Sequence, residues 1–326
     1  MKTEILRLLK ECEDYLSGQE LCTQLGVSRT AVWKVIKQLQ GEGYKIEAVR
    51  NRGYRLVEGG DVITEAEIKS CMARENRGWR VVCYDETDST NTRAKYLAEG
   101  GAGEGTLVVA ETQNAGKGRR GRNWVSPPGT GIWMSLVLRP DIPPSKASMV
   151  TLAAALGVSE GVFQATRLSA QIKWPNDIVL NGKKICGILT EMSTELETIQ
   201  YVVVGIGINV NMKEFPEELS KTATSLCLET GKTYKRAPVI SAVADSFWHY
   251  YQAFLEAGDL SSLKEEYESR LVNINRRVTV LDPAGAYPGV CRGIDREGEL
   301  LVEREDGQLH RVLSGEVSVR GICGYV

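Results

Sequence analysis

Histidine is almost absent from the sequence, and this scarcity limits the chemistry that the chain can perform. Two histidines, His249 and His310, occur among 326 residues. A catalytic pair of serine or cysteine with histidine depends on an imidazole base, so the composition argues against such pairs. It argues equally against metal sites built mainly from histidine.

Paired cysteines and long apolar runs are also missing. The 8 cysteines are scattered without a C-x-x-C pair, which argues against a zinc ribbon and a redox dithiol. No apolar run approaches the roughly 18 residues of a membrane span. The charged residues within Met1–Lys10 are unlike a signal peptide. We therefore expect a cytoplasmic protein with reduced thiols and no membrane partner.

A strong net charge is absent as well. Lysine and arginine total 40, and aspartate and glutamate total 42, so the formal net charge is −2. A chain that bound nucleic acid along its whole surface would be basic throughout, so any such contact has to be a local patch. The length is sufficient for two or three domains.

Residues 1–60 show the pattern of a helix-turn-helix domain. Ser17 and Ser28 each precede an apolar helical stripe and are expected to cap two helices, with Gly26 in the turn between them. The second helix would bury Val32 and Ile36 and expose a polar, basic front. The residues of that front that we expect to contact DNA are Ser28, Arg29, Thr30, Trp33 and Lys34.

The run YKIEAVRNRGYRL alternates like a two-stranded ribbon, which would form the wing of a winged helix-turn-helix. Its turn would place Arg50 and Arg52 against a phosphate backbone. From Ser28 to Leu56, seven lysines and arginines stand against two glutamates, a local excess of +5 that favours DNA binding. Two alternatives remain open. The charges could form the solvated face of a small helical module, or the domain could make protein contacts only.

The rest of the chain divides into a large and a small segment. After a hinge at Glu58-Gly59-Gly60-Asp61, residues 61–273 mix β-rich runs with helical ones, which predicts a mixed sheet flanked by helices. Residues 274–326 consist of short strands and turns and predict a small β-barrel. The expected fold class is therefore multidomain α+β.

A basic, glycine-rich loop lies in the large segment. The stretch AGKGRRGRNWV at 115–125 combines Lys117 and three arginines with three glycines. It does not complete a Walker A loop, and although it matches G-x-G-x-x-G by spacing, the residues that follow do not continue as a helix. Its cations suit phosphates and a carboxylate, and Trp124 could stack on a purine. The alternative is an exposed basic loop beside a core tryptophan.

Two further motifs supply polar groups. KWPND at 173–177 combines the cation of Lys173, the amide of Asn176 and the carboxylate of Asp177, which suit phosphate, sugar and Mg²⁺. Its proline marks the edge of a sheet or a bulge. GIGINVN at 205–211 lets a backbone approach a ligand closely and contains Asn209. For each motif, turn chemistry alone is the alternative.

Four motifs occur together in the order typical of one family. DSTNTRAK (88–95), ETQNAGKGRRGRNW (111–124), KWPNDIVLNGKKICGIL (173–189) and GIGINVN (205–211) resemble those of the biotin–protein ligases. With the N-terminal domain included, essentially the whole chain is similar to the bifunctional bacterial form, the biotin operon repressor and biotin–[acetyl-CoA-carboxylase] ligase. The resemblance implies a class II synthetase-like catalytic domain and an SH3-like C-terminal barrel.

The resemblance also implies an activity. Biotin and ATP, with Mg²⁺, would give biotinyl-5′-AMP, and biotin would pass to one lysine of a biotin carboxyl carrier protein of acetyl-CoA carboxylase or pyruvate carboxylase. No enzyme nucleophile is required, so catalysis would rest on positioning and on stabilisation of phosphate charge. Biotinyl-AMP would also act as corepressor and favour a homodimer on operator DNA.

Individual residues take roles from the same resemblance. Those matched to the biotin site are Ser89, Thr90, Asn91, Gln113, Lys117, Gly118, Arg119 and Lys184. Those matched to the ATP site are Arg119, Arg122, Trp124, Lys173, Asn176, Asp177 and Asn209, with Mg²⁺ at Asn176 and Asp177. The expected catalytic groups are Lys184, Lys117, Arg119 and Asp177.

One position departs from the family pattern, and two other functions compete. Many members have arginine where this chain has Lys117, and lysine lacks the bidentate fork of a guanidinium, so looser retention of the adenylate is expected.

A biotin sensor without catalysis is one rival function, and a ligase for lipoate or octanoate is the other. The retained polar residues oppose the first, and the winged domain with the basic loop opposes the second.

Overall fold

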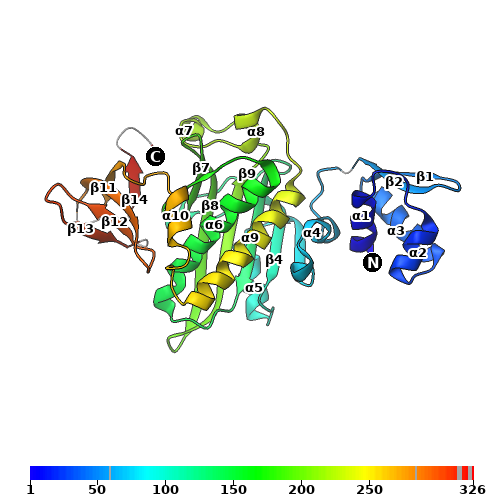
Figure 1. Cartoon of the computed structure of the whole chain (residues 1–326), viewed down its shortest axis with the longest axis horizontal. Helices are drawn as coiled ribbons and strands as arrows, with labels where there is room; N and C mark the ends of the chain where they lie inside the picture. Colours follow the sequence, from blue (N-terminus) through cyan, green and yellow to red (C-terminus); the bar gives the residue numbers. More distant parts are fainter. Residues whose placement is uncertain (59, 283–284, 314–317, 322–324) are drawn as a thin grey trace.

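The chain folds into three domains that follow one another along the long axis of the molecule (Figure 1). The structure is a computed structural model that describes residues 1–326 except 59, 283–284, 314–317 and 322–324. Part of the expected hinge, Gly59, and part of the last expected strands, at 314–317, therefore lie outside the described residues.

The N-terminal domain is a winged helix-turn-helix, as the sequence predicts. Ser17 forms a capping box with Glu20, Gly26 adopts a left-handed conformation with φ 65°, and the Ser28 side chain accepts a hydrogen bond from the Ala31 amide. The helices pack around one apolar core. The elements are α1 (Lys2–Glu11), α2 (Gly18–Leu25), α3 (Arg29–Gly41), β1 (Lys45–Val49) and β2 (Gly53–Glu58).

The central domain contains a seven-stranded mixed sheet with the order β3-β4-β5-β9-β8-β7-β6. Strands β3 and β4 pair in parallel and the other neighbours are antiparallel. The turn at Asn181-Gly182, with positive φ at both residues, joins β7 to β8. The strands are β3 (Val81–Thr87), β4 (Thr106–Gln113), β5 (Gly131–Leu138), β6 (Gln171–Lys173), β7 (Asp177–Leu180), β8 (Lys183–Glu195) and β9 (Thr198–Asn209).

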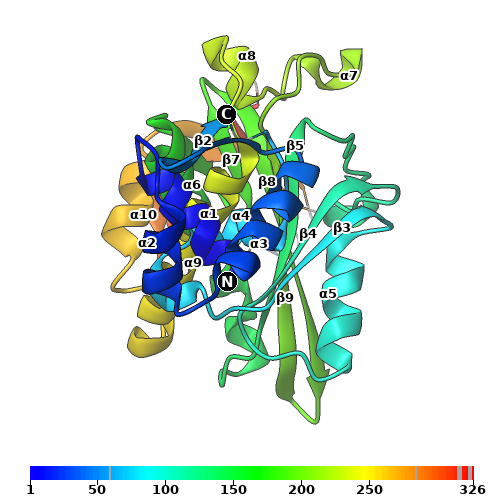
Figure 2. The same ribbon diagram turned by 90° about the vertical axis from the view of Figure 1, so that its right-hand side faces the viewer.

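Helices cover both faces of this sheet (Figure 2). Alternate residues of β4 point to opposite faces, so that Leu107 and Val109 join the core beneath α6 and α9, whereas Val108 packs with α5. The helices are α4 (Glu65–Cys71), α5 (Thr90–Glu99), α6 (Ala147–Thr166), α7 (Glu217–Ser220), α8 (Leu226–Thr230), α9 (Arg236–Ala257) and α10 (Lys264–Arg270), with 3₁₀ turns η1 (Arg74–Asn76), η2 (Arg119–Gly121) and η3 (Pro144–Lys146).

Helix α6 departs from the expectation that no apolar run approaches the length of a membrane span. The stretch Pro144–Thr166 has the length and composition of a membrane span, but 67% of its most apolar window is buried inside the structure. A Cβ atom added at Gly157 would lie 2.3 Å from the Cα of Phe247, so the glycine allows α9 to approach closely. The apolarity of α6 is therefore explained by its place in the core.

The C-terminal domain is a five-stranded antiparallel sheet with the order β13-β12-β11-β10-β14. This is the small β domain that the sequence predicts. Its strands are β10 (Arg277–Leu281), β11 (Tyr287–Ile294), β12 (Leu300–Glu303), β13 (Leu309–Val312) and β14 (Ser318–Gly321).

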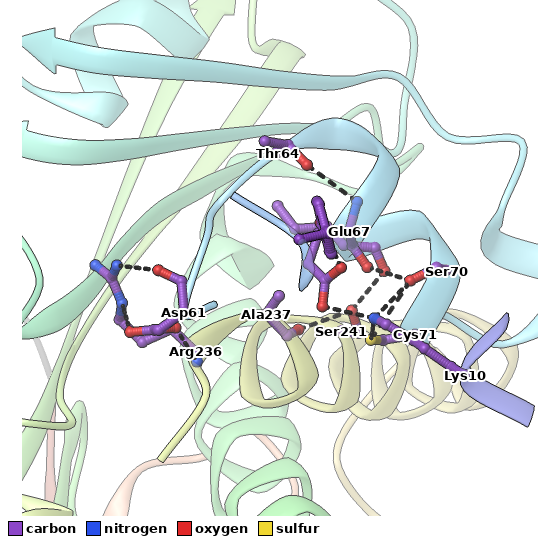
Figure 3. A network of polar contacts seen from close by, with 11 residues as sticks. Lys10, Asp61, Thr64, Glu67, Ser70, Cys71, Arg236, Ala237 and Ser241 are labelled. Carbon is purple, nitrogen blue, oxygen red and sulfur yellow. Dashed lines mark hydrogen bonds and ion pairs between the residues drawn. The ribbon is translucent and has the colours of Figure 1, made fainter. Parts of the chain in front are cut away.

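Polar contacts join the winged domain to the central domain (Figure 3). The Lys10 ammonium of α1 lies 2.5 Å from a carboxylate oxygen of Glu67 in α4, and the Tyr44 hydroxyl donates to the other oxygen at 2.6 Å. Glu67 is only 4% exposed. A second group, centred on Arg236 of α9, holds the linker residue Asp61. One ion pair thus joins the winged domain directly to α4, and a second ion pair joins the linker to α9.

Candidate active site

A small cavity opens on the central sheet. Its walls come from the start of α5, the end of β4, the basic loop, β5, the β6–β7 turn, β8 and β9. The lining residues are Ser89, Thr90, Asn91, Gln113, Lys117, Gly118, Arg119, Trp124, Trp133, Met134, Asn176, Lys184, Gly187, Ile188, Leu189, Gly205, Ile206 and Gly207. The part at the start of α5 is rich in uncharged hydrogen-bonding groups, and Arg119 and Lys184 bring cations from the basic loop and β8. The third cation, Lys117, reaches back to α5, where its ammonium lies 3.4 Å from Thr92 Oγ1.

The uncharged end is built at the amino terminus of α5. The backbone amide of Thr90 donates to Gln113 Oε1 at 2.8 Å, and the Gln113 amide donates to Ser126 Oγ at 2.8 Å. The hydroxyl of Ser89 does not cap α5, although Ser89 occupies the capping position. A polar ring that both donates and accepts hydrogen bonds would find partners here.

The basic loop folds back on itself beside the cavity. The Gly118 amide donates to the Arg122 carbonyl at 2.7 Å, and the Trp124 amide donates to the Gly116 carbonyl at 2.9 Å. A guanidinium nitrogen of Arg119 donates to Asn176 Oδ1 at 2.7 Å. Burial is the main cause that lowers the pKa of Arg119, but a guanidinium keeps its proton at neutral pH. The loop therefore brings a fixed, partly desolvated positive charge to the cavity.

Lys184 of β8 supplies another cation. Its ammonium lies 2.5 Å from Asp177 Oδ1 and 5.2 Å from the ring centroid of Trp124. The indole rests on glycines, because a Cβ at Gly187 would lie 2.9 Å from Trp124 and one at Gly207 would lie 2.7 Å from it. Small residues on two adjacent strands thus create the seat for the indole.

The structure brings together all eight residues expected at the biotin site, since each of them lines the cavity. The residues expected at the ATP site are divided. Those that line the cavity are Arg119, Trp124 and Asn176. Those outside the lining are Arg122, Lys173, Asp177 and Asn209.

The residues outside the lining have other surroundings. The Lys173 ammonium lies 3.3 Å from the ring centroid of Tyr325, whose hydroxyl donates to Asp177. Asn209 is buried and donates to the Thr224 carbonyl at 3.1 Å, and Arg122 is exposed. The motif KWPND forms the turn between β6, an edge strand, and β7, with a cis Trp174–Pro175 bond, so its proline lies beside the sheet edge as expected rather than within a strand.

Sequence reasoning missed several lining residues and one partner. Trp133 and Met134 of β5 and Ile188 and Leu189 of β8 line the cavity, but they belong to apolar strands that read as ordinary sheet core. Tyr325 contacts Asp177 from a point 148 residues away along the chain. No local pattern at the end of the chain indicates that contact.

The residues expected to bind DNA lie on the outer face of α3 and on the wing. Trp33 is 51% exposed, and Ser28, Arg29, Thr30 and Lys34 are exposed as well. On the wing, Arg52 pairs with Asp14 at 3.1 Å and lies over the Tyr15 ring at 4.3 Å. Arg52 is therefore held against its own domain, whereas α3 presents its polar front outward.

The fold and the cavity define a class of protein: a winged helix-turn-helix domain joined to an α/β domain whose cavity carries cations suited to an anionic ligand. Three family models match the chain, the HTH domain at 2–55, the Biotin/lipoate A/B protein ligase family at 84–209 and the Biotin protein ligase C terminal domain at 274–320. The chain is 41% identical over 322 residues to the bifunctional ligase/repressor BirA of Bacillus subtilis, covering 98% of each chain. It belongs to this family of bifunctional biotin ligases and repressors.

A more distant relative and a solved structure agree with this assignment. BirA of Escherichia coli is 30% identical over 309 residues, 94% of each chain. The biotin protein ligase of Aquifex aeolicus, solved in complex with biotin and ATP, is 33% identical with a TM-score of 0.66 and covers 74% of this chain and 99% of its own. The chain is thus similar in structure to a biotin protein ligase that was solved with biotin and ATP bound.

Proposed function

We propose that this chain activates biotin with ATP and transfers it to a lysine of a biotin carboxyl carrier protein, and that it represses transcription of biotin genes. The observation that carries the proposal is the cavity, whose lining combines groups suited to the ureido ring of biotin with the cations of Lys117, Arg119 and Lys184. The winged domain supplies the DNA-binding part. The domain boundaries 1–60, 61–273 and 274–326 are part of this proposal.

The chemistry needs charge rather than a nucleophile. A carboxylate oxygen of biotin attacks the α-phosphorus of ATP, and the bond to the bridging oxygen of the β-phosphate breaks to release pyrophosphate. The amine of the carrier lysine then attacks the acyl carbon, and AMP leaves. The cations of the cavity hold the biotin carboxylate and the phosphate oxygens in line and stabilise the charge that develops on them.

Mg²⁺ would enter this site with the phosphates of ATP. The structure does not favour Asn176 and Asp177 as its direct ligands. Asn176 Oδ1 accepts from Arg119, and the two Asp177 oxygens face Lys184 and the Tyr325 hydroxyl. Because these oxygens already contact positive or donor groups, a cation would have to displace them. We assign no step to the metal.

Mass spectrometry of a carrier domain incubated with the protein, biotin and Mg-ATP tests the ligase activity. We expect a mass increment of one biotinyl group on one lysine. An unmodified carrier domain would contradict the proposal. Thermal shift with biotin and with lipoate distinguishes the rival ligase, because only the true ligand stabilises the native state.

Lys117 provides a prediction about the adenylate. A Lys117→Arg variant should release biotinyl-AMP about fivefold more slowly, because a guanidinium can make a second charge-assisted hydrogen bond. The dissociation rate of labelled adenylate measures this, with Lys117→Met as the control that should release it faster. An unchanged rate in Lys117→Arg would remove the idea that lysine loosens retention.

We propose further that the adenylate promotes a homodimer whose two winged domains bind a palindromic operator, inside the cytoplasm. The exposed front of α3 supports the DNA contact. Sedimentation with and without biotin and ATP tests the dimer, and a larger species only with both ligands is expected. A monomer under all conditions would contradict it.

Lys34 tests the DNA contact itself. Lys34→Ala should weaken operator binding at every salt concentration and reduce the slope of log K against log salt by about 1, as expected for one lost phosphate contact. Lys264→Ala on α10, 41% exposed and outside the winged domain, is the control and should leave the slope unchanged. Equal slopes for all three proteins would show that Lys34 does not contact phosphate.

A further inference from the structure

A chain of hydrogen bonds runs from the surface of the central domain to the uncharged end of the cavity. It begins at Glu191 of β8, which pairs with the Lys95 ammonium at 2.7 Å. The amide nitrogen of Asn91 donates to the second Glu191 oxygen at 2.7 Å and to the Leu189 carbonyl at 3.2 Å. Glu191 itself is not among the residues that line the cavity.

The Glu191 carboxylate stays ionised in this position. Burial raises its pKa, but hydrogen bonds from Lys95 and Asn91 outweigh burial, so that the pKa is lowered. An ionised carboxylate can only accept hydrogen bonds. The Asn91 nitrogen therefore faces Glu191, at the shorter distance, and the Leu189 carbonyl, and the Asn91 oxygen points the other way.

Ser135 continues the chain from Asn91. Its hydroxyl oxygen lies 2.6 Å from Asn91 Oδ1 and 2.7 Å from Thr90 Oγ1, and Ser135 is fully buried with 0% exposure. A serine hydroxyl has one proton and can donate in only one of these contacts. Because Asn91 Oδ1 can only accept, Ser135 must donate to it. The short contact to Thr90 is then satisfied only if Thr90 donates to Ser135.

The consequence appears inside the cavity. Gln113 Oε1 competes for the Thr90 proton, but it lies farther away, at 3.2 Å, and already accepts from the Thr90 amide. Thr90 lines the cavity, and since Ser135 donates its own proton to Asn91, we infer that the hydroxyl proton of Thr90 points away from the cavity, across the 2.7 Å contact to Ser135. Its oxygen therefore presents lone pairs to a ligand. The ureido ring of biotin carries two N–H donors, and a buried acceptor is the partner that such a donor needs.

We propose that Glu191 fixes the direction of this relay through Asn91 and Ser135 and thereby makes Thr90 a hydrogen-bond acceptor for a ring N–H of biotin. The inference rests on the proposed function, because it takes biotin as the ligand of the cavity. Glu191 is in this sense a positioning residue. It determines which ring the pocket accepts, without contacting that ring.

Two variants test the proposal: Glu191→Gln alone, and Glu191→Gln combined with a substitution of Lys95, the partner of Glu191 in the ion pair. Lys95 would hold the oxygen of the new side-chain amide, so the nitrogen of that amide would face the Asn91 nitrogen. Two donors would then oppose each other, and the hydrogen bond that Asn91 donates in the original protein would be lost. We expect the Kd for biotin to rise about tenfold or more, while the KM for ATP stays unchanged. In the double variant Lys95→Met/Glu191→Gln, the glutamine is free to turn its oxygen toward Asn91, and biotin affinity should return to within about threefold of the original.

Calorimetric titration of the full chain with biotin, together with ATP kinetics, measures these effects. Lys95→Met alone should bind biotin normally, because the hydrogen bond from Asn91 and the charge of Lys117 still favour the ionised Glu191 carboxylate, which remains an acceptor for Asn91. Ser135→Ala interrupts the relay without touching the ion pair and should also weaken biotin about tenfold, even if Glu191→Gln does not fold. A biotin analogue with a ring CH₂ in place of the N–H should lose less affinity in Glu191→Gln than in the unsubstituted protein.

The outcomes separate the two proposals. Normal biotin affinity in Glu191→Gln or in Ser135→Ala, or a double variant as weak as Glu191→Gln, would overturn the role of Glu191. Absence of biotin binding by the unsubstituted protein would instead overturn the proposed function. Recovery in the double variant would support the relay, because two merely structural losses would add rather than cancel.

Discussion

Replacing Lys184 by glutamine is expected to slow the formation of biotinyl-AMP by about 10²- to 10³-fold. The ammonium lines the cavity and is held by the ion pair with Asp177 at 2.5 Å. A cation fixed in this way needs no reorganisation when negative charge develops on the reacting oxygens, so its loss raises the barrier directly. Glutamine keeps a hydrogen-bond donor but removes the charge. Single-turnover formation of the adenylate from biotin and Mg-ATP measures the effect.

The neighbouring residue gives a matched control for this prediction. Lys183 precedes Lys184 on β8, and its ammonium lies 3.5 Å from the Ser220 carbonyl rather than at the cavity. Successive residues of a strand point to opposite faces, so Lys183→Gln removes an equal charge from the other side. We expect its adenylation rate to stay within about threefold of the original, since surface charges contribute little. Equal losses in both variants would mean that net charge, rather than position, explains the effect.

Features that depend on local sequence could be predicted. The caps at Ser17 and Ser28 and the left-handed Gly26 are properties of a few consecutive residues, and they fix the helix-turn-helix before any tertiary contact is known. The hairpin at Asn181-Gly182 follows from turn chemistry in the same way. The residues expected at the biotin site, all of which line the cavity, could be named because the resemblance to the biotin–protein ligases rests on short motifs that contain them.

Features that depend on distant partners could not be predicted. Glu191 reads as one of two acidic residues on the long strand β8, and its contact with Asn91 joins residues 100 positions apart. The Tyr325 contact with Asp177 spans 148 positions. The Mg²⁺ assignment to Asn176 and Asp177 came from their chemistry alone, and the structure shows that Arg119 and Lys184 already contact their oxygens. Residue type suggests a ligand, but the neighbours decide whether its atoms are free.

Replacing Arg236 by methionine is expected to destabilise the protein by about 3 kcal/mol. Arg236 is 2% exposed and contacts Asp61 of the linker at 2.7 Å (Figure 3). It also contacts Glu111 of β4 at 2.9 Å. Removing one partner of a buried ion pair typically costs about 3–5 kcal/mol because it leaves the other charge unpaired. We take the lower end, because the Asp61 and Glu111 side chains are 30% and 29% exposed and would gain water.

The loss should appear as a fall of about 6–12 °C in the melting temperature of the central domain. Arg292→Met in the C-terminal domain is the control, because Arg292 pairs with Glu303 at 2.6 Å but is 42% exposed. An exposed pair contributes less than about 1 kcal/mol, so its variant should melt almost as the original does. Urea unfolding followed by circular dichroism compares the two. If both variants lost the same small amount, the buried position of Arg236 would contribute no more to stability than an arginine at the surface.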